Sequence, residues 1–551
     1  MATTFVRQLG AESGIQLNPL RDNSGIPATS NSDQIFGIIM RATRGRIDQP
    51  FEVDSGTVYD KLGAGEQIRV NALNEAWVHV VEALSQGAYS AVVQRLVTDK
   101  AKIKYLVVRK AAPVEDEAQT YIYDVTYELP KDAFFLAVKH LECFNDGIIV
   151  KFRAEENFEA GKDVANDKIQ FCLCDPEGNT LYRYEGSLKA DAKDDYGNSA
   201  YLPDVIAAAT DAVEVTVGVQ GDEAVVEPNS EAYGYDINGQ QVWAESGVQV
   251  CFEEGGFDYA VSDYTKARQA LQNSAFDYAY VSSGGSRSPA LLAQLTQLCY
   301  ETNRQLRFDV PGDLTPEKAI AFVEALDLGS SKTAHLIHAF WSPLKSDDPT
   351  GINPAGYFGV ATLNIAYACA RNAQKNAKGF APKNYPIAGV NYPISRTRTK
   401  QAYQPSNQEL NRLALAKINP CLYEVYSGGG SYVFRDSLTS AKVDNSLRKL
   451  IAVADMSTSI DDAVCRAAKE FLHLPMTVTI KRLQDFLKSL FEGAEASGWL
   501  VASSDPQMEG NAWRFVVQAN EQRPYDAVDV SYWLRYDGTA RQIFVTQTLT
   551  K

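Results

Sequence analysis

The sequence of 551 residues lacks several features by which broad classes of protein are identified. No stretch approaches the ~20 consecutive apolar residues of a membrane-spanning helix, and the first ten residues, MATTFVRQLG, contain no apolar signal-peptide core. We therefore expect neither membrane insertion nor secretion by the general route. Five His and eight scattered Cys offer few metal ligands and no disulfide framework. We expect no metal and no cofactor.

Motifs of common enzymes are also missing. The chain contains no GxxxxGK[ST], HExxH or GxSxG sequence and no GxGxxG after a predicted strand. Residues 282–287 could hold an anion on their amides, but no Lys stands at a phosphate-binding position, so a strand-to-helix turn is favoured. His335 and His338 are predicted to point to opposite faces of one strand. Cys172 and Cys174 could bind a metal, but no second pair is near, which favours a structural pair. We predict no catalytic residues.

Charge is unevenly distributed along the chain, whose net value is −16. Residues 151–260 hold 7 Lys and Arg against 23 Asp and Glu, so this block alone accounts for the whole excess. Residues 371–417 hold nine basic residues and one acid. Such a basic patch could meet nucleic acid or an acidic protein, but a solvated face with scattered counter-charges is favoured. The acidic block is typical of a solvent-facing module.

The order of predicted elements indicates several domains. A strand in IFGIIM, a helix from Asn74 to Gly87 and a strand in AYSAVVQRLV make a small α/β unit. Short strands with turn signals then predict a β-rich part. From residue 276 strands and helices alternate. They include a helix with Thr315 as N-cap, Pro316 at its first position and Gly329 beyond its end, and a long helix over 354–374. This alternation predicts a mostly parallel sheet covered by helices.

The last 150 residues are predicted to be α+β. Helices centre on DDAVCRAAKEFL and TIKRLQDFLKSLFEGA, and strands follow in AWRFVVQ, DAVDVSYWLRY and RQIFVTQTLT. The last two strands are joined through Asp537–Gly538, which makes them a candidate β-hairpin. The fold class is therefore multidomain α/β and α+β.

Four segments, in order, resemble the tail sheath proteins of contractile phages and related injection machines. They are residues 37–65 with their R-A-T-R-G turn, 76–97, 353–390 and 408–439. The family's W-G-x-R-T sequence is replaced here by residues 433–439, VFRDSLT, and residues 100–255 match no part of the family.

The resemblance implies a subtilisin-like-topology α/β core with a β-rich inserted outer domain and extended terminal arms. It implies a structural subunit that forms a helical homo-oligomer around a tail tube and contracts to drive the tube through the host envelope for genome delivery. Its partners would be the tail tube, baseplate and tail terminator or neck proteins, with no direct nucleic acid and no stable membrane association. Its location would be the virion tail, after assembly in the bacterial host cytoplasm.

Two other functions stay open at this point. A serine hydrolase of subtilisin-like topology needs a nucleophile turn, but residues 353–356, Asn-Pro-Ala-Gly, stand where it is expected. A bacteriocin or a cellular contractile injection system would use the same kind of sheath.

Two segments are predicted to make the assembly contacts. Residues 478–491 form an amphipathic helix, and the resemblance implies that its charged face meets the tube through Lys481, Arg482, Asp485 and Lys488; an ordinary surface helix is the alternative. Residues 541–550 alternate in a strand pattern, and the resemblance implies an exchanged inter-subunit strand; the alternative is pairing within its own hairpin. The strand residues are Gln542, Ile543, Phe544, Val545, Thr546, Gln547, Thr548 and Leu549.

We accordingly divide the chain into six parts. They are an N-terminal extended arm (1–33), a small α/β domain (34–99), a β-rich acidic outer domain (100–260), an α/β domain of subtilisin-like topology (261–399), an α+β C-terminal domain (400–540) and a C-terminal exchanged strand (541–551).

Overall fold

An eight-stranded sheet forms the centre of the body. A computed structural model describes residues 29–112, 119–154, 167–226, 233–235, 241–245, 249–330 and 332–548. The strand order is β2-β3-β1-β13-β14-β15-β19-β20. The six central strands run parallel, and the two edge strands are antiparallel to their neighbours. The strands are β1 (Ile35–Met40), β2 (Phe51–Val53), β3 (Ser90–Arg95), β13 (Tyr280–Ser282), β14 (Gln305–Val310), β15 (Ile337–Trp341), β19 (Ile418–Tyr426) and β20 (Gly429–Phe434).

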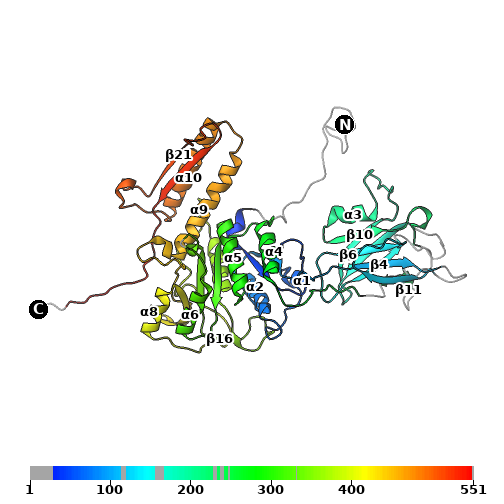
Figure 1. The fold of residues 1–551 in the computed structure, drawn as a ribbon, viewed down its shortest axis with the longest axis horizontal. Helices are drawn as coiled ribbons and strands as arrows, with labels where there is room; N and C mark the ends of the chain where they lie inside the picture. The colour runs from blue at the N-terminus through cyan, green and yellow to red at the C-terminus, as the bar shows by residue number, and fades with distance from the viewer. Residues whose placement is uncertain are drawn as a thin grey trace, which may run out of the picture.

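Helices cover both faces of this sheet (Figure 1). Successive residues of β1 point to opposite faces: Phe36 and Ile38 pack with α2 and α7, whereas Ile35 and Ile39 pack with α4 and α5. Because both faces are buried, β1 is apolar throughout instead of alternating with polar residues. The helices of the body are α1 (Val58–Leu62), α2 (Glu75–Ser85), α4 (Val261–Gln272), α5 (Pro289–Thr302), α6 (Pro316–Leu326), α7 (Ala361–Asn372) and α8 (Asn407–Leu415).

A second unit lies to one side of the body and is built from two antiparallel sheets (Figure 1). Their shared core includes Phe135, Phe152 and Phe171. We call this unit, residues 102–253, the outer module. Its β-rich character agrees with the sequence prediction, whereas its helix α3 (Leu202–Ala209) was not predicted. The strands are β4 (Tyr105–Lys110), β5 (Tyr121–Thr126), β6 (Leu136–His140), β7 (Ile149–Ala154), β8 (Lys168–Cys174), β9 (Thr180–Ser187), β10 (Val213–Val217), β11 (Tyr233–Tyr235) and β12 (Gln241–Glu245).

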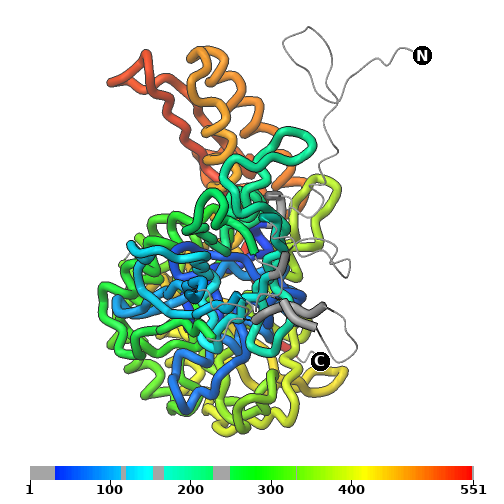
Figure 2. Tube along the Cα trace, turned by 90° about the vertical axis from the view of Figure 1, so that its right-hand side faces the viewer, coloured from blue at the N-terminus to red at the C-terminus, as the bar shows by residue number. Residues whose placement is uncertain are grey.

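A third unit projects from the body as a narrow arm, visible in two orthogonal views (Figures 1 and 2). It consists of α9 (Ile451–Glu470), α10 (Met476–Ala496), β21 (Trp513–Ala519) and β22 (Val528–Leu534), packed around their own apolar core. We call it the projecting unit. A small sheet on the body contains β16 (Leu344–Ser346), β17 (Gly356–Tyr357) and β18 (Lys400–Gln401). No described helix is both long and apolar enough to cross a membrane.

The start of α7 differs from the sequence prediction. The helix begins at Ala361 and not near residue 354, because Gly356 and Tyr357 pair with β16. The Asp309 carboxylate then accepts hydrogen bonds from the amides of Val360 and Ala361, at 2.6 and 2.8 Å, and so fixes where the helix starts.

The prediction of a hairpin joined through Asp537–Gly538 is wrong. β22 pairs with β21, from Trp513 opposite Leu534 to Ala519 opposite Val528. Residues beyond Asp537 form no strand up to residue 548. His335 was also misplaced, because β15 begins at Ile337 and His335 lies in a 3-10 turn before it.

Candidate assembly surfaces

Helix α10 carries the predicted charged face on its outer side. Lys481, Arg482, Asp485 and Lys488 are all exposed. Leu483, Leu487 and Phe491, from the apolar stripe, are buried in the core of the projecting unit. The structure therefore brings the four site residues together on one solvent-facing strip. Lys488 Nζ also lies 4.0 Å from Glu492 Oε1. Three cations against the carboxylates of Asp485 and Glu492 leave the strip net positive.

The C-terminal segment leaves the body as an extended chain (Figure 1). Arg541 anchors it, because its Nε donates to Asp436 Oδ1 at 2.7 Å. Gln542 through Thr548 are exposed, and Ile543, Phe544 and Val545 are 82, 89 and 88% exposed. Leu549 lies outside the described residues. Three consecutive large apolar side chains exposed to solvent are typical of a site that contacts another protein surface.

The sheet of the projecting unit has two open edges. Among the described residues, β21 and β22 pair only with each other in a two-stranded sheet. A two-stranded sheet is only marginally stable alone, and here packing on α10 supports it. The unpaired backbone of each edge can accept a further strand.

A buried ionic cluster connects the projecting unit to the body. The carboxylate of Asp455, in α9, receives Arg371 Nη2 of α7 at 2.7 Å and Arg307 Nη2 of β14 at 3.3 Å. Burial alone would raise the pKa of Asp455, but the charges of Arg371 and Arg307 outweigh it and hold this pKa below its usual range. The base of α9 is thereby fixed to both the sheet and a core helix.

The same cluster holds the root of the N-terminal arm. The Asp33 carboxylate lies 3.3 Å from Lys383 Nζ and 3.4 Å from Lys375 Nζ, and its carbonyl accepts a hydrogen bond from Asn372. Burial lowers the pKa of Lys383, an effect that Asp33 opposes. The residues before this point that could exchange between subunits, 1–28, lie outside the described part of the chain.

The R-A-T-R-G-R turn forms the joint with the outer module. Arg41 Nη2 and Arg95 Nη2 share the Glu254 carboxylate at 2.8 and 3.3 Å, and both guanidinium groups are buried. Arg44 pairs with Asp146 at 2.5 Å. Gly45 has a φ of +120° and no room for a side chain, since an added Cβ would collide with the Phe51 ring. Sequence reasoning missed this joint, although three arginines in six residues were a usable signal.

The basic segment 371–417 is not one solvated patch. Arg371 and Lys383 belong to the cluster around Asp455 and Asp33, and Arg396 forms a buried pair with Glu82 at 2.6 Å. Buried cations cannot contact nucleic acid. Five other basic residues of the segment are exposed, so it divides between interior pairs and a solvated face; these five are Lys375, Lys378, Arg398, Lys400 and Arg412.

The residues considered for chemistry lie in structural settings. Cys172 and Cys174 are buried side by side on β8, and burial raises the pKa of Cys174 to about 11. His338 Nε2 lies 3.1 Å from the carbonyl of His335. In the part of the chain that the structure describes, no group of three or more His, Cys, Asp or Glu could hold a metal.

Comparisons with known proteins give a likeness of fold. No family model and no curated protein matches the sequence. The sheath tail protein Lin1278 from Listeria innocua has a TM-score of 0.50 and 12% identity, over 90% of this chain and 94% of that chain. The sheath tail protein DSY3957 from Desulfitobacterium hafniense has a TM-score of 0.48 and 13% identity, over 96% and 98%. The PVC sheath of an extracellular contractile injection system, in its contracted state, has a TM-score of 0.41 and 14% identity, over 52% and 74%. The chain thus has the fold of the sheath tail protein Lin1278 along nine-tenths of its length, in agreement with the four sheath-like sequence segments.

Proposed function

We propose that this chain is the structural subunit of a contractile tail sheath and not an enzyme. Copies polymerise as a helical sleeve around a tail tube and contract to drive the tube through a host envelope, for genome delivery from a virion. The observation that carries the proposal is the sheath fold along nine-tenths of the chain, together with four sheath-like segments in family order. The parallel central sheet supports a subtilisin-like topology for the core.

The charged strip of α10 is the proposed contact with the tube. Its three cations, Lys481, Arg482 and Lys488, would meet acidic residues of the tube protein. Exposed ion pairs contribute roughly 0–1 kcal/mol each and are screened by salt. Individually weak contacts suit a surface that must hold the tube before contraction and release it afterwards.

Strand exchange is the proposed link between subunits. Residues 542–549 of one copy would add to an open edge of the sheet formed by β21 and β22 in a neighbour, and the N-terminal arm of another copy would complete that sheet. Main-chain hydrogen bonds of this kind persist while domains rotate about flexible connections. The sleeve would therefore stay connected during contraction. Baseplate and tail terminator or neck proteins would bind its two ends, and assembly would take place in the bacterial host cytoplasm.

Electron microscopy of the purified full chain tests this proposal. Negatively stained samples at high concentration are expected to contain hollow tubes or stacked rings of uniform diameter. The lumen should accept a tube made of the partner protein. A sample that stays monomeric at every concentration, with and without the tube protein, would contradict the proposal. Copurification with a genome-filled head would distinguish a phage from a bacteriocin or a cellular injection system.

A further inference from the structure

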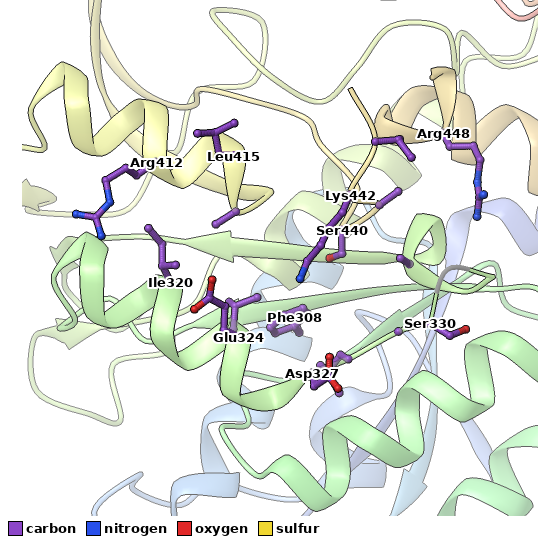
Figure 3. A pocket seen from close by; sticks show the side chains of 17 residues that line it. Phe308, Ile320, Glu324, Asp327, Ser330, Arg412, Leu415, Ser440, Lys442 and Arg448 are labelled. Atoms are coloured by element: carbon purple, nitrogen blue, oxygen red, sulfur yellow. The ribbon is translucent and has the colours of Figure 1, made fainter. Parts of the chain in front are cut away.

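The body and the projecting unit each carry a hollow lined by both apolar and charged side chains. The hollow of the body, about 790 Å³, lies between α6 and α8, with Ile320 and Leu415 on opposite sides and Lys442 pointing into it (Figure 3). Of the described residues that line it, only Phe308 belongs to a strand, and its strand β14 is paired on both sides, with β13 and β15. This hollow therefore offers no open sheet edge to a partner.

The hollow of the projecting unit lies along the free edge of β21, and we call it the edge pocket. Its volume is about 510 Å³. It is lined by the first three residues of β21, by residues 507–509 and 511–512 before them, and by Glu495 at the end of α10. None of the described lining residues belongs to β22. A strand that paired with the free edge of β21 would therefore pass beside this pocket.

The edge pocket combines aromatic rings with negative charge. The rings of Trp513 and Phe515 are stacked with their centroids 5.9 Å apart. Glu495 and Glu509 are exposed, and Glu495 Oε2 accepts a hydrogen bond from Trp513 Nε1 at 2.8 Å. Arg514 is the one cation among the described lining residues, so the lining is net negative. Carboxylates and ring faces together attract an ammonium or guanidinium group.

The hydrogen bonds of β21 determine which of its residues face the free edge. The carbonyl of Ala512 accepts from the Arg535 amide at 2.9 Å, on the side of β22, so even-numbered residues turn their backbone groups toward β22. The odd-numbered residues of β21 turn theirs toward the free edge. The carbonyl of Asn511 already accepts from the Ser503 amide at 3.2 Å. A partner strand can therefore pair with residues 513–519 and must leave the sheet at the edge pocket.

The apolar side of the C-terminal segment matches the buried face of β21. Trp513 and Phe515 pack in the core of the projecting unit. Residues directly opposite each other on paired strands share a face of the sheet. The odd-numbered residues Ile543, Val545 and Leu549 would therefore extend this apolar face. The seven residues 543–549 also equal β21 in length.

Chain direction decides which end of the segment meets the edge pocket. Antiparallel addition, which continues the pairing of β21 with β22, places the end of the segment beside Trp513, whereas parallel addition places it beside Ala519. Lys551 is the single charged residue in 542–551. We infer that the C-terminal segment of a neighbouring copy adds antiparallel to the free edge of β21, with Leu549 opposite Trp513 and the Lys551 ammonium group in the edge pocket. This inference rests on the proposed strand exchange and specifies its edge, its direction and its end contact.

A synthetic peptide of residues 542–551, amidated at its end, tests the edge and the direction without polymerisation. The dilute full-length chain carries Cys465→Ser, which removes its exposed thiol, and Gln518→Cys at an exposed position of β21. In a buffer of oxidised glutathione, the peptide with Phe544→Cys should form a disulfide with this chain at least tenfold faster than the peptide with Thr548→Cys. Antiparallel pairing puts residue 544 opposite residue 518 and residue 548 about 13 Å further along. Faster reaction of the Thr548→Cys peptide would show parallel addition, and equal rates would exclude this edge; either result overturns the inference.

Charge reversal tests the edge pocket. The Lys551→Glu peptide should bind the full-length chain about fivefold more weakly than the unchanged peptide, as expected for one exposed ion pair. Glu509→Lys in the protein should weaken binding of the unchanged peptide and restore binding of the Lys551→Glu peptide. Glu521→Lys is the matched control, because it makes the same charge change at an exposed position beyond the other end of β21. A larger effect of Glu521→Lys than of Glu509→Lys, or no effect of either, would overturn the pocket contact.

The peptide measurements also separate this inference from the proposed function, because they need no tubes. If the chain forms tubes but neither peptide test succeeds, the sheath function stands and the antiparallel site on β21 is refuted. If both tests succeed with a chain that never forms tubes, the strand site stands and the sheath function is refuted.

Discussion

At the scale of single residues, His338 makes stability depend on pH. Burial, reinforced by the charge of Arg307, lowers the pKa of His338 to about 3 from its usual 6.5. The unfolded chain therefore binds a proton that the folded chain rejects, and stability is lost as pH falls below 6.5. His79 has the opposite sign: burial opposes its protonation, but Glu75 outweighs burial and raises its pKa. The stability that His79 contributes is full below pH 6.5 and is lost as pH rises through its folded pKa.

Replacing His338 by glutamine should flatten the acid limb of the stability curve. Between pH 6.5 and 4.5 the wild type should lose about 2–3 kcal/mol more unfolding free energy than His338→Gln, at about 1.4 kcal/mol per pH unit. Urea denaturation across this range measures the difference, and comparing the two proteins cancels other titrating groups. Identical pH dependence of both proteins would show that His338 does not titrate on unfolding.

Replacing Glu254 should also lower the unfolding free energy strongly. Glu254→Gln leaves Arg95, whose pKa burial lowers, without its carboxylate partner, and Arg41 with Glu66 alone. We expect a loss of about 3 kcal/mol of unfolding free energy. The neighbouring Glu253→Gln is the matched control, because Glu253 is 44% exposed in its pair with Lys104 and should cost under about 1 kcal/mol. If both variants lose the same unfolding free energy in chemical denaturation, the buried pairs of Glu254 contribute no more to stability than an exposed pair.

At the scale of elements, the outer strip of α10 can be reversed without touching its core. The triple variant Lys481→Glu, Arg482→Glu and Lys488→Glu should fold normally yet bind the tube up to about 100-fold less, since three exposed pairs supply at most about 3 kcal/mol. Cosedimentation with tubes at low salt measures this loss. A control with the same charge change replaces the exposed Lys100, Lys131 and Lys193 by Glu. Equal binding by both triples would exclude the strip as the tube contact.

Elements set by nearby residues were predictable from sequence, and those set by distant ones were not. Helix α6 begins at Pro316, directly after Thr315, and ends at Leu326, before Gly329, as expected, because the residues that bound it are near it in the sequence. The start of α7 depends on Asp309, more than fifty residues earlier, and the joint depends on Arg41 and Glu254, which are 213 residues apart. The charged strip of α10 followed from helical periodicity alone, whereas no local signal shows that β22 prefers β21 to the segment after Gly538.

At the scale of the whole molecule, the C-terminal segment can be removed without loss of a core. Deleting residues 542–551 keeps the pair between Arg541 and Asp436 and removes side chains that are exposed up to residue 548, so unfolding free energy should change by less than about 0.5 kcal/mol. The truncated chain should stay monomeric by light scattering at concentrations where the full chain forms tubes. Removing residues 1–20 should weaken assembly in the same direction. If the C-terminally truncated chain still forms tubes, side-chain contacts between globular faces must hold the subunits together.

The two ends of the outer module lie next to each other, so the module can be deleted and the chain closed with a short linker. Lys102 and Glu253 face each other across an isolated bridge, with Lys102 N donating to the Glu253 carbonyl at 2.9 Å, so a short Gly/Ser linker can close the gap left by deleting residues 103–252. Because the body and projecting unit keep their separate cores, polymerisation should be retained in electron micrographs. Soluble monomers that never assemble would show that the module takes part in subunit contacts.

The uneven charge of this chain has a colloidal consequence for any polymer it forms. Residues 151–260 hold the whole surplus of 16 negative charges, and the remainder of the chain is neutral. With the outer module facing solvent, each filament would be a neutral shaft surrounded by a negative fringe. Such fringes repel over roughly a Debye length, about 8 Å at physiological ionic strength, and so oppose side-by-side bundling. The module that we predict to be dispensable for building one filament would then keep neighbouring filaments apart.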